Sequence, residues 1–557
     1  MKVVVIGAVA AGPKTASKIL RLRPDAEVTV LEKGEFVSFA GCGLPYYLSD
    51  VVKEQKELLS TPIGVPRDPA FFRKVKNVRV LIRTEALTID RKSRQVEAKN
   101  LQTGESFSLP YDKLVLATGA QPIIPPISGI NHKKVFTLHN IEDCEAIRSV
   151  LANGDKKAVI IGGGLIGVET AEALVRKDCS VTIVEMLPQI LSVLDWEIAR
   201  QVELHMRSKG VEIRTETKAL AIEGTGDEIR CVTTDKGEIP ADLVILGVGV
   251  RPNVSLAKEA GLEIGGTGAI RVNRRMQTSD LDIYAVGDCA ESRHLVTGQP
   301  CYVPLGSTAN KQGRVAALNI CGLEDSFPGV LGSMVCQVFD FTVARTGLSE
   351  AQARDAGYDV VTCLVPGPDR AHYMPTAKPL MLKLITDRAT GRLLGAQATG
   401  PGEAAKRMDV AATAITAAMT VDQVSKLDLS YAPPYSPAMD NLITASDVIR
   451  NKISGAMVGI TPMELRNKPA ESYFFLDVRS PGEVAKVALS GAVNIPLGAL
   501  RDRVNEIPRD KEIIAFCQVS LRAYEAALIL KANGFDRVKV LDGGVAMWPY
   551  ERIFGKQ

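Results

Sequence analysis

The sequence lacks the residue groupings on which several common kinds of site depend. None of its ten cysteines forms a Cys-x-x-Cys pair, and only five of its 557 residues are histidine. Zinc and iron–sulfur sites use clustered cysteine and histidine ligands, so we expect no metal centre. The cysteine spacing gives no secreted disulfide framework either, which favours a reducing cytoplasm as the location.

The sequence also has no long apolar run and no marked excess of one charge. No stretch is long enough to span a bilayer, and the formal net charge is +3. We therefore expect no membrane anchor and no nucleic-acid partner. With 46% hydrophobic and 24% charged residues, the chain has the composition of a soluble protein. Its length predicts roughly three or four domains.

Two strand–turn–helix–strand patterns indicate nucleotide-binding sites. The first has an apolar strand over residues 2–6, a glycine turn over residues 7–12, a helix from residue 13 and a second strand that stops at Glu32. Such a turn places a pyrophosphate at the helix N-terminus, and the acid binds a ribose hydroxyl. Val9 occupies the middle glycine position, so this copy alone leaves a plain βαβ turn as an equal alternative.

A second copy makes a chance match improbable. The strand over residues 158–161 leads into a turn with glycine at all three positions, and the strand over residues 181–184 ends at Glu185. A carboxylate there would repel a 2′-phosphate, so this site favours NAD over NADP. Arg176 and Lys177 lie near in sequence and keep NADP as the alternative.

A cysteine framed by glycines lies in the stretch Ser38–Tyr46. Cys42 stands between Gly41 and Gly43, and Pro45 is well placed to begin a helix. A helix N-terminus favours thiolate over thiol, so Cys42 is predicted to be a nucleophile near neutral pH. The alternative is a small structural residue in a tight loop.

Two further apolar strands end in Thr118-Gly119 and Gly287-Asp288. An acid at a strand end suits hydrogen bonding to a polyol at the carboxyl edge of a parallel sheet. Together with the segment Gly247–Asn253, this series of motifs resembles the FAD- and NAD(P)-dependent pyridine nucleotide–disulfide oxidoreductases over about residues 1 to 445. The implied cofactor-binding residues are Gly7, Val9, Ala10, Gly12, Glu32, Lys33, Thr118, Gly119, Gly162, Gly164, Gly167, Glu185, Gly249, Gly287 and Asp288.

The resemblance implies an α/β protein with two nested Rossmann-like domains. An FAD-binding domain over residues 1–120 and 246–324 would be interrupted by an NAD-binding domain over residues 121–245. An α+β dimerisation domain over residues 325–445 would then form a homodimer. Within the FAD site, the resemblance gives Glu32 the adenosine ribose and Asp288 the ribityl chain.

Cys42 has no second cysteine at the spacings of dithiol members, because Pro45 and Tyr47 stand there. Its segment resembles instead the coenzyme A disulfide reductase branch, which also contains NADH oxidases, peroxidases and persulfide reductases. Oxidase and peroxidase members carry a histidine where this chain has Ala10, which disfavours those activities. Gly41 stands where the branch usually has asparagine, so a side-chain donor is missing beside the cysteine.

Two tyrosine segments support this branch. The run from Tyr431 to Tyr435 resembles a signature whose tyrosine reaches the cysteine of the partner subunit, and residues 370–375 resemble the segment that supplies a second tyrosine, Tyr373. A phenol can hydrogen-bond and protonate a sulfur leaving group. The alternative is that both are ordinary interface aromatics. The implied coenzyme A positions are Lys14, Arg21, Arg23, Ser38, Phe39, Asn310 and Lys311.

After a polar linker over residues 446–457, residues 458–557 resemble an α/β rhodanese domain with its Cys-x-x-x-x-Arg loop. A buried strand ends at Cys517, and Arg522 closes the loop at the start of a helix. Consecutive backbone N–H groups before a helix form an anion-binding nest, to which Arg522 adds a fixed charge. Cys517 is therefore predicted to be a thiolate that can hold a persulfide.

These patterns predict an NADH-dependent flavoprotein, with NADPH as the alternative reductant, that reduces persulfide, polysulfide or coenzyme A disulfide. Hydride would pass from NADH to FAD and electrons on to Cys42, while Cys517 would accept sulfane sulfur and hand it on for release as hydrogen sulfide. Coenzyme A would be substrate or carrier. The alternatives are an NADH oxidase or peroxidase in which Cys42 cycles through sulfenic acid, and a low-turnover sulfur carrier or redox sensor.

Overall fold

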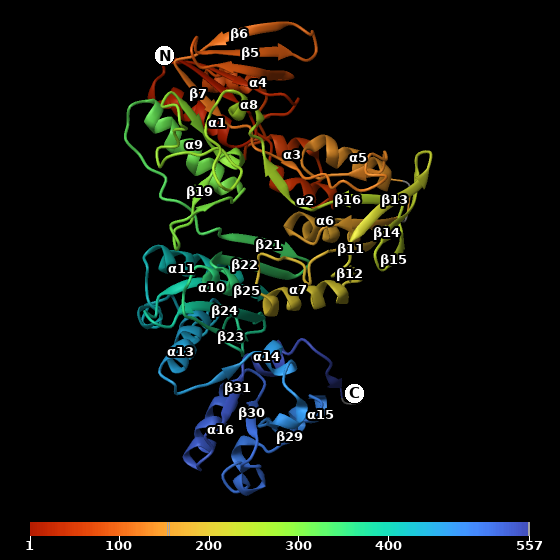
Figure 1. Cartoon of the computed structure of the whole chain (residues 1–557), viewed down its shortest axis with the longest axis vertical. Coiled ribbons are helices and arrows are strands. Elements are labelled where there is room, and N and C mark those ends of the chain that lie inside the picture. The colour runs from red at the N-terminus through yellow and green to blue at the C-terminus, as the bar shows by residue number, and fades with distance from the viewer. Residues whose placement is uncertain (153, 155, 555–557) are drawn as a thin grey trace. The chain divides into compact units, whose positions relative to one another are not determined.

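The computed structural model describes residues 1–152, 154 and 156–554 (Figure 1). It divides into two compact units, one of Met1–Pro188 with Gly210–Val330 and one of Gln189–Lys209 with Leu331–Gln557. None of the helices formed by the described residues has the length and apolar content needed to cross a membrane.

The first unit contains two five-stranded parallel sheets of the same plan, one nested in the sequence of the other. The outer sheet has the order β18-β7-β1-β2-β3 and the nested sheet the order β12-β11-β10-β16-β9. The outer strands are β1 (Lys2–Ile6), β2 (Glu27–Leu31), β3 (Arg79–Leu81), β7 (Lys113–Leu116) and β18 (Ile283–Ala285). The nested strands are β9 (Val135–Phe136), β10 (Lys157–Ile161), β11 (Ser180–Val184), β12 (Glu212–Arg214) and β16 (Leu243–Leu246).

The central strands of both sheets are almost wholly apolar because both faces are covered, by helices and by antiparallel strands that share the same hydrophobic cores. Val3, Val4 and Val5 in β1 are buried, as are the four residues from Ala158 to Ile161 in β10. The helices of this unit are α1 (Ala11–Leu22), α2 (Leu44–Leu48), α3 (Gln55–Leu59), α4 (Pro69–Lys76), α5 (Ile141–Leu151), α6 (Leu165–Val175), α8 (Ser255–Glu259) and α9 (Gly306–Ile320). The predicted nested Rossmann-like architecture is confirmed.

Two antiparallel meanders and two short strand pairs complete the first unit. The meanders are β4 (Thr84–Asp90), β5 (Gln95–Asn100) and β6 (Ser106–Pro110), and β13 (Ala219–Thr225), β14 (Glu228–Thr234) and β15 (Gly237–Pro240). The pairs are β8 (Ala120–Pro122) with β17 (Val250–Pro252), and β19 (Ser292–Arg293) with β20 (Pro300–Cys301). The β8–β17 pair lies where the chain passes between the two parallel sheets.

The second unit begins with an antiparallel sheet of order β21-β22-β25-β24-β23. Its strands are β21 (Met334–Val338), β22 (Phe341–Gly347), β23 (Val360–Pro368), β24 (Pro379–Asp387) and β25 (Leu393–Gly400). Helices α11 (Ala404–Thr416) and α13 (Asn441–Ile453) pack on this sheet, with α10 (Glu350–Asp355) and α12 (Val421–Val424) beside them.

The last part of the second unit is a parallel sheet of order β26-β31-β30-β27-β29. Its strands are β26 (Gly459–Ile460), β27 (Tyr473–Asp477), β29 (Val493–Asn494), β30 (Glu512–Phe516) and β31 (Val538–Leu541), and β28 (Val487–Ala488) pairs with β32 (Ile553–Phe554). Its helices are α14 (Pro462–Arg466), α15 (Pro481–Lys486) and α16 (Leu521–Ala532).

Residues 446–453 differ from the polar linker that the sequence predicts, because they continue helix α13. Ser446 and Ile449 are buried, and the Lys452 side chain bonds one residue of the antiparallel sheet and one directly after a strand of the parallel sheet. Its Nζ donates to the carbonyl of Thr362 in β23 (2.8 Å) and to Oδ2 of Asp542 (2.5 Å). Composition misled the prediction, because polar Ser446 is buried in the helix and the side chain of Lys452 is only 9% exposed.

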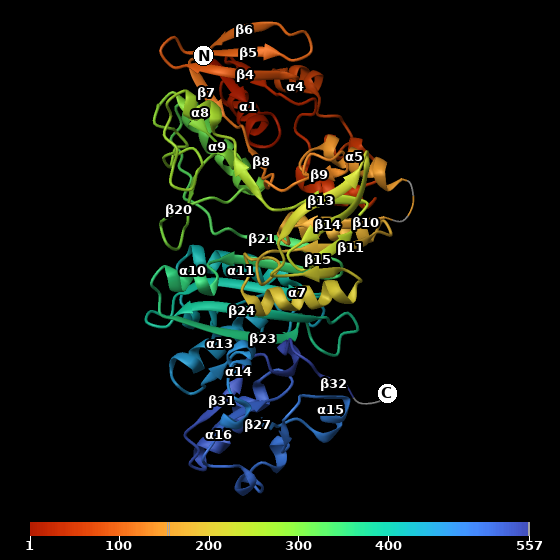
Figure 2. The same ribbon diagram turned by 45° about the vertical axis from the view of Figure 1, so that its right-hand side comes forward.

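Helix α7 (Trp196–Ser208) lies between β11 and β12 in the sequence but packs on β22 and β25 of the second unit (Figure 2). A buried ionic cluster fixes its first turn. Nζ of Lys383 in β24 lies 3.2 Å from Asp195, 2.9 Å from Glu197 and 2.8 Å from Glu350. The Lys383 side chain is 1% exposed, so its charge depends on these carboxylates for compensation.

Replacing Lys383 with methionine is expected to destabilise the second unit by about 3–5 kcal/mol, because three carboxylates would lose their buried partner. Both tryptophans, Trp196 and Trp548, belong to that unit, so thermal unfolding followed by tryptophan fluorescence reports on it. The control is Lys426→Met, which breaks an exposed pair with Asp422 and should cost less than about 1 kcal/mol. Equal shifts in the two variants would contradict the prediction.

Candidate active site

In both parallel sheets, a glycine in the first turn of a helix packs directly against the glycine that follows the preceding strand. A Cβ added to Gly12 would lie 1.9 Å from the carbonyl oxygen of Gly7, and one added to Gly167 would lie 2.1 Å from that of Gly162. Gly7 and Gly162 themselves have φ of 106° and 107°. Only glycine fits at these positions, which leaves backbone N–H groups open to a pyrophosphate at each helix N-terminus. Both turns therefore fit a dinucleotide.

The acid at the end of each second strand also fixes its turn. The carboxylate of Glu32 accepts hydrogen bonds from the N–H groups of Ala8 (2.7 Å) and Gly34 (2.8 Å). In the nested sheet, Glu185 accepts from Gly163 (2.7 Å) and Leu187 (2.9 Å). Burial raises the pKa of Glu32. Each acid lies beside its glycine turn, where the sequence predicts a ribose contact, whereas Lys33 points outward to Glu85 (2.7 Å).

Two amide side chains that the sequence analysis did not single out, one buried and one partly buried, hold the other predicted motifs. Gln312, fully buried in α9, accepts from the N–H of Gly287 (2.8 Å) and donates to the hydroxyl of Ser292 (3.0 Å). Asn253 donates to the carbonyl of Thr118 (2.8 Å) and accepts at its own carbonyl from the Thr118 hydroxyl (2.7 Å). Burial raises the pKa of Asp288. The only sequence signal for both amides is that they stand inside the matched motifs.

Cys42 lies in a short 3-10 turn (Gly41–Gly43) directly before α2, with Pro45 in the first turn of that helix, as predicted. Helix α2 is anchored on α5. The hydroxyl of Tyr47 donates to Glu145 (2.6 Å), and the Arg148 guanidinium lies 4.4 Å from the centre of its ring. Burial and the bond to Glu145 raise the pKa of Tyr47 to about 12. The segment of the nucleophile is thus held by a helix of the nested sheet.

The predicted thiolate at Cys42 is not supported by the protein groups around it. Partial burial raises the pKa of Cys42, and the carboxylates of Glu169 and Asp288 act in the same direction. Helix α2 has only five residues, so its dipole is weak. Glu169, in α6, was missed by the sequence analysis. Burial raises its pKa to about 7, so it carries a variable charge near the cysteine.

Gly41 leaves room for a larger residue. An added Cβ would lie 3.7 Å from the ring of Phe39, an ordinary contact, whereas one on Gly43 would lie 2.6 Å from Leu58. The asparagine usual in the resembling branch would therefore fit at position 41, and nothing in the structure explains the glycine.

The predicted coenzyme A residues lie on α1, on α9 and on the segment before Cys42. Lys14 and Arg21 are exposed two turns apart on α1, and Asn310 and Lys311 are exposed on α9. These helices cross closely, since a Cβ on Gly313 of α9 would lie 2.8 Å from the carbonyl oxygen of Ala11. The N–H of Ser38 donates to Ala8 in the first glycine turn (2.7 Å), which places Ser38 and Phe39 beside that turn. Arg23 instead pairs with Asp25 (3.1 Å).

The two predicted tyrosines lie on hydrogen-bonded segments of the second unit. The N–H of Ala371 donates to Pro433 (3.3 Å), and Arg370 donates to the carbonyl of Pro434 (3.1 Å). Tyr373 is 64% exposed and Tyr431 52% exposed. Their rings are therefore free to meet a second molecule.

Cys517 lies buried at the end of β30, in a loop whose carbonyl groups point one way. The carbonyls of Cys517 and Gln518 accept from the N–H groups of Val545 and Ala546, each at 3.0 Å. In a trans peptide the N–H points opposite to the C=O, so the next two N–H groups of the loop point away from this contact. The predicted anion-binding nest is consistent with that arrangement.

Arg522, predicted to add a fixed charge to the loop, is held by a partner that the sequence analysis did not name. Its guanidinium makes a two-pronged ion pair with Glu483 in α15, at 2.8 and 2.6 Å. Glu483 was missed because it lies in a different helix. The Arg522 guanidinium and the Ser480 N–H and hydroxyl lower the pKa of Glu483 to about 2, so the pair stays charged over the whole physiological range.

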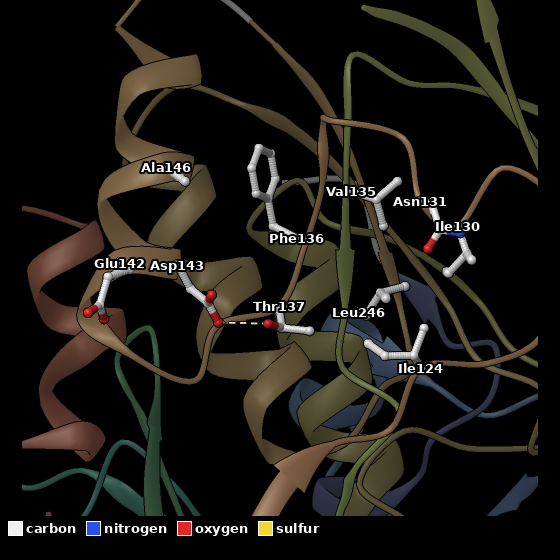
Figure 3. Close-up of a pocket in the computed structure, with 10 residues that line it drawn as sticks. All are labelled: Ile124, Ile130, Asn131, Val135, Phe136, Thr137, Glu142, Asp143, Ala146 and Leu246. Carbon is white, nitrogen blue, oxygen red and sulfur yellow. Dashed lines mark hydrogen bonds between the residues drawn. The ribbon is translucent and has the colours of Figure 1, made fainter. Parts of the chain in front are cut away.

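Two other features lie apart from the predicted residues. A pocket of about 370 Å³ lies between β9 and the N-terminus of α5, where Thr137 donates to Asp143 (2.6 Å), and none of the predicted site residues lines it (Figure 3). Within the described residues, one group of three metal-ligand types comes together, Glu223, Cys231 and Glu238. Arg230 already pairs with both carboxylates, so their charge is compensated.

Residues 1–313 match the family model "Pyridine nucleotide-disulphide oxidoreductase". The chain belongs to this family. Residues 334–443 match its dimerisation domain, and residues 461–550 match the rhodanese-like domain. Flavin and a pyridine nucleotide are the cofactors that the family implies, and the two glycine turns described above fit them.

Relatives and solved structures are similar over different lengths of the chain. The NAD(P)H sulfur oxidoreductase (CoA-dependent) of Pyrococcus furiosus is 40% identical over 451 residues, which are 81% of this chain and 99% of the relative. The structure of an NAD-dependent persulfide reductase from A. fulgidus is 47% identical, with a TM-score of 0.95 over 98% of this chain and 100% of that one. The Bacillus anthracis CoADR-RHD structure is 39% identical, with a TM-score of 0.92 over 98% and 97%.

Replacing Gly12 with alanine should abolish flavin retention, because the new Cβ would clash with the carbonyl of Gly7 that shapes the first turn. The measurement is the flavin absorbance of the purified protein relative to its protein content. Gly266→Ala is the control, since an added Cβ there meets nothing within 4 Å. A flavin content equal in the two variants would show that this turn does not hold the cofactor.

Replacing Glu169 with glutamine should lower the pKa of Cys42, because a carboxylate that disfavours the thiolate is removed. In flavin-free protein at mildly alkaline pH, alkylation of Cys42 should become about two- to fivefold faster. Mass spectrometry of the Cys42 peptide resolves it from the other cysteines. Glu105→Gln on an exposed turn changes the net charge equally, and a matching acceleration there would contradict a local effect.

Proposed function

We propose that the protein is an FAD-dependent NADH reductase of persulfide, polysulfide or coenzyme A disulfide sulfur. The observation that carries the proposal is the combination of a single exposed cysteine, Cys42, beside a flavin-type glycine turn with a buried cysteine, Cys517, in a rhodanese loop. The relative from Pyrococcus furiosus matches the reductase part alone, whereas the persulfide reductase structure matches nearly the whole chain. This difference supports sulfane sulfur as the substrate of the fused protein.

The residues divide between holding the cofactors and handling sulfur. Gly7, Gly12 and Glu32 would hold FAD, and Gly162, Gly167 and Glu185 would hold NADH, with Glu185 disfavouring the 2′-phosphate of NADPH. Bound flavin would carry a pair of electrons from the nicotinamide to sulfur. The proposed net reaction, RSSH + NADH + H⁺ → RSH + H₂S + NAD⁺, conserves atoms and charge.

Cys42 would form the bond to the sulfur that is reduced. Its raised pKa means that the thiol needs a positive or hydrogen-bonding group before it becomes a nucleophile. Cations on α1 and α9 would supply charge to the phosphates of coenzyme A, whose thiol is then the substrate or the carrier of sulfur. Cys517 would take sulfane sulfur from the donor and pass it to that carrier.

A homodimer would complete the site. Tyr373 and Tyr431 are exposed on two hydrogen-bonded segments in the region that matches the dimerisation model. In the dimer each would donate a proton to the leaving sulfur at Cys42 of the partner subunit. A reducing cytoplasm is the location that suits ten cysteines, none of which forms a disulfide.

Replacing Cys42 and Cys517 separately by serine tests the division of labour. Cys42→Ser should lower NADH oxidation with every sulfur acceptor by about a thousandfold or more, as expected when a covalent nucleophile is lost. Cys517→Ser should spare coenzyme A disulfide and lower turnover of a polysulfide donor about tenfold or more. The measurement is the loss of NADH absorbance without oxygen. Equal losses for both acceptors in Cys517→Ser would contradict the relay.

The NADH oxidase alternative also needs a test, because an NADH oxidase of Methanocaldococcus jannaschii is 34% identical to this chain. The test is NADH oxidation with oxygen as the only electron acceptor. Ala10 in the first glycine turn offers no acid or base beside the cysteine. We expect NADH oxidation with oxygen alone to be slow beside that with persulfide. The reverse order would favour the oxidase.

A further inference from the structure

The loop that holds Cys517 carries almost no net charge. Residues 518–521 are Gln, Val, Ser and Leu, and the side chains of Val519 and Leu521 are 39% and 64% exposed. Arg522 is the one charged residue of the loop, and its guanidinium is held by Glu483 at 2.8 and 2.6 Å. The rim around the cysteine is therefore apolar and its cation is compensated.

Other charged side chains near the loop also form ion pairs. Arg479 donates to Asp477 (2.6 Å), with both side chains 1% exposed. Asp542, which follows β31, pairs with Lys452 (2.5 Å), and these side chains are 4% and 9% exposed. The Arg522 guanidinium also interacts with the Cys517 side chain, but Glu483 compensates its charge. The uncompensated positive potential at Cys517 comes from the loop N–H groups and the N-terminus of α16, a helix of 12 residues. That potential is equivalent to about half an elementary charge, which suits one negative charge.

Sulfur donors differ in the charge that they bring to this loop. The persulfide group of a thiol carries at most one negative charge, and an uncharged carbon chain attached to it can lie on an uncharged rim. Thiosulfate is a dianion, and its charge would add to that of the Cys517 thiolate with no free cation to meet it.

We propose that Glu483 determines the specificity of the rhodanese loop, because by pairing with Arg522 it makes Cys517 select thiol persulfides and reject thiosulfate. The inference rests on the proposed role of Cys517 as sulfur acceptor. In the transfer, the thiolate of Cys517 attacks the outer sulfur of RSSH, and a new S–S bond forms as the old one breaks. RS⁻ leaves with the electron pair of that bond and takes up the proton, so no external oxidant or reductant is needed.

The test loads sulfur onto Cys517 of the full-length protein without NADH. Three donors are compared: mercaptoethanol persulfide, whose only ionisable group is the persulfide, thiosulfate, and methanethiosulfonate, which resembles thiosulfate but carries one charge less. Quenched samples are analysed by mass spectrometry for one added sulfur on the Cys517 peptide. In the unaltered protein, both low-charge donors should load Cys517 at least about tenfold faster than thiosulfate, and added salt should narrow that ratio.

Variants separate charge from structure. Glu483→Gln should free Arg522 to bind thiosulfate, so the ratio of loading rates between the low-charge donors and thiosulfate should fall about tenfold. Glu483→Asp keeps the negative charge and should retain the discrimination against thiosulfate. The matched control is Glu506→Gln, which breaks an equally two-pronged but exposed pair with Arg503 in the same domain. It should leave the ratio unchanged.

Several results would overturn the inference. These are a ratio unaffected by Glu483→Gln, an equal slowing of all three donors, which indicates a structural role alone, or thiosulfate as the fastest donor in the unaltered protein. A failure to load Cys517 from any donor would overturn the proposed acceptor role as well. Because loading uses neither NADH nor flavin, failure of NADH-dependent reduction is a separate outcome.

Discussion

The close approach of a helix to a strand-end carbonyl is the contact on which both nucleotide sites depend. Gly12 and Gly167 sit where any side chain would strike the carbonyl of the glycine that begins the turn. Because the helix is that close, the acid at the end of the second strand, Glu32 or Glu185, can accept a hydrogen bond from a backbone N–H of the glycine turn. The same contact positions Ser38, through the Ala8 carbonyl, and so fixes the start of the segment that carries Cys42.

Local patterns predicted the parts of the fold that depend on local rules. The apolar strands, the glycine turns and the acids Glu32 and Glu185 obey spacing over a few tens of residues, so the nested parallel sheets were predictable. The helix after Cys42 followed from Pro45, whereas the flanking glycines indicated only a tight loop, which is a 3-10 turn in the structure. The rhodanese loop from Cys517 to Arg522 was also a local pattern, and the family match extends over residues 461–550.

The features that the sequence did not show depend on groups distant in sequence. The thiolate at Cys42 was inferred from the adjacent helix, but Glu169 and Asp288 approach it from other parts of the first unit and raise its pKa. Arg522 was predicted to be a fixed charge, but its partner Glu483 stands in another helix and was not named. Gln312 and Asn253 stand within recognised motifs, but only the folded chain shows which carbonyl or N–H each one satisfies.

Helix α13 runs without a break across residue 446, where the sequence predicts the start of a linker. A cut at residue 446 would pass through a helix that covers β23 and β24, and the Cys363 thiol, which donates to the carbonyl of Ala445, would lose part of its cover. Lys452 near the end of that helix joins Thr362 to Asp542. The helix that packs on β23 and β24 thus ends only at Ile453, shortly before the rhodanese part begins. Separating the two parts at residue 446 would therefore remove cover from the antiparallel sheet and would part Lys452, which stays with Asp542, from the carbonyl of Thr362.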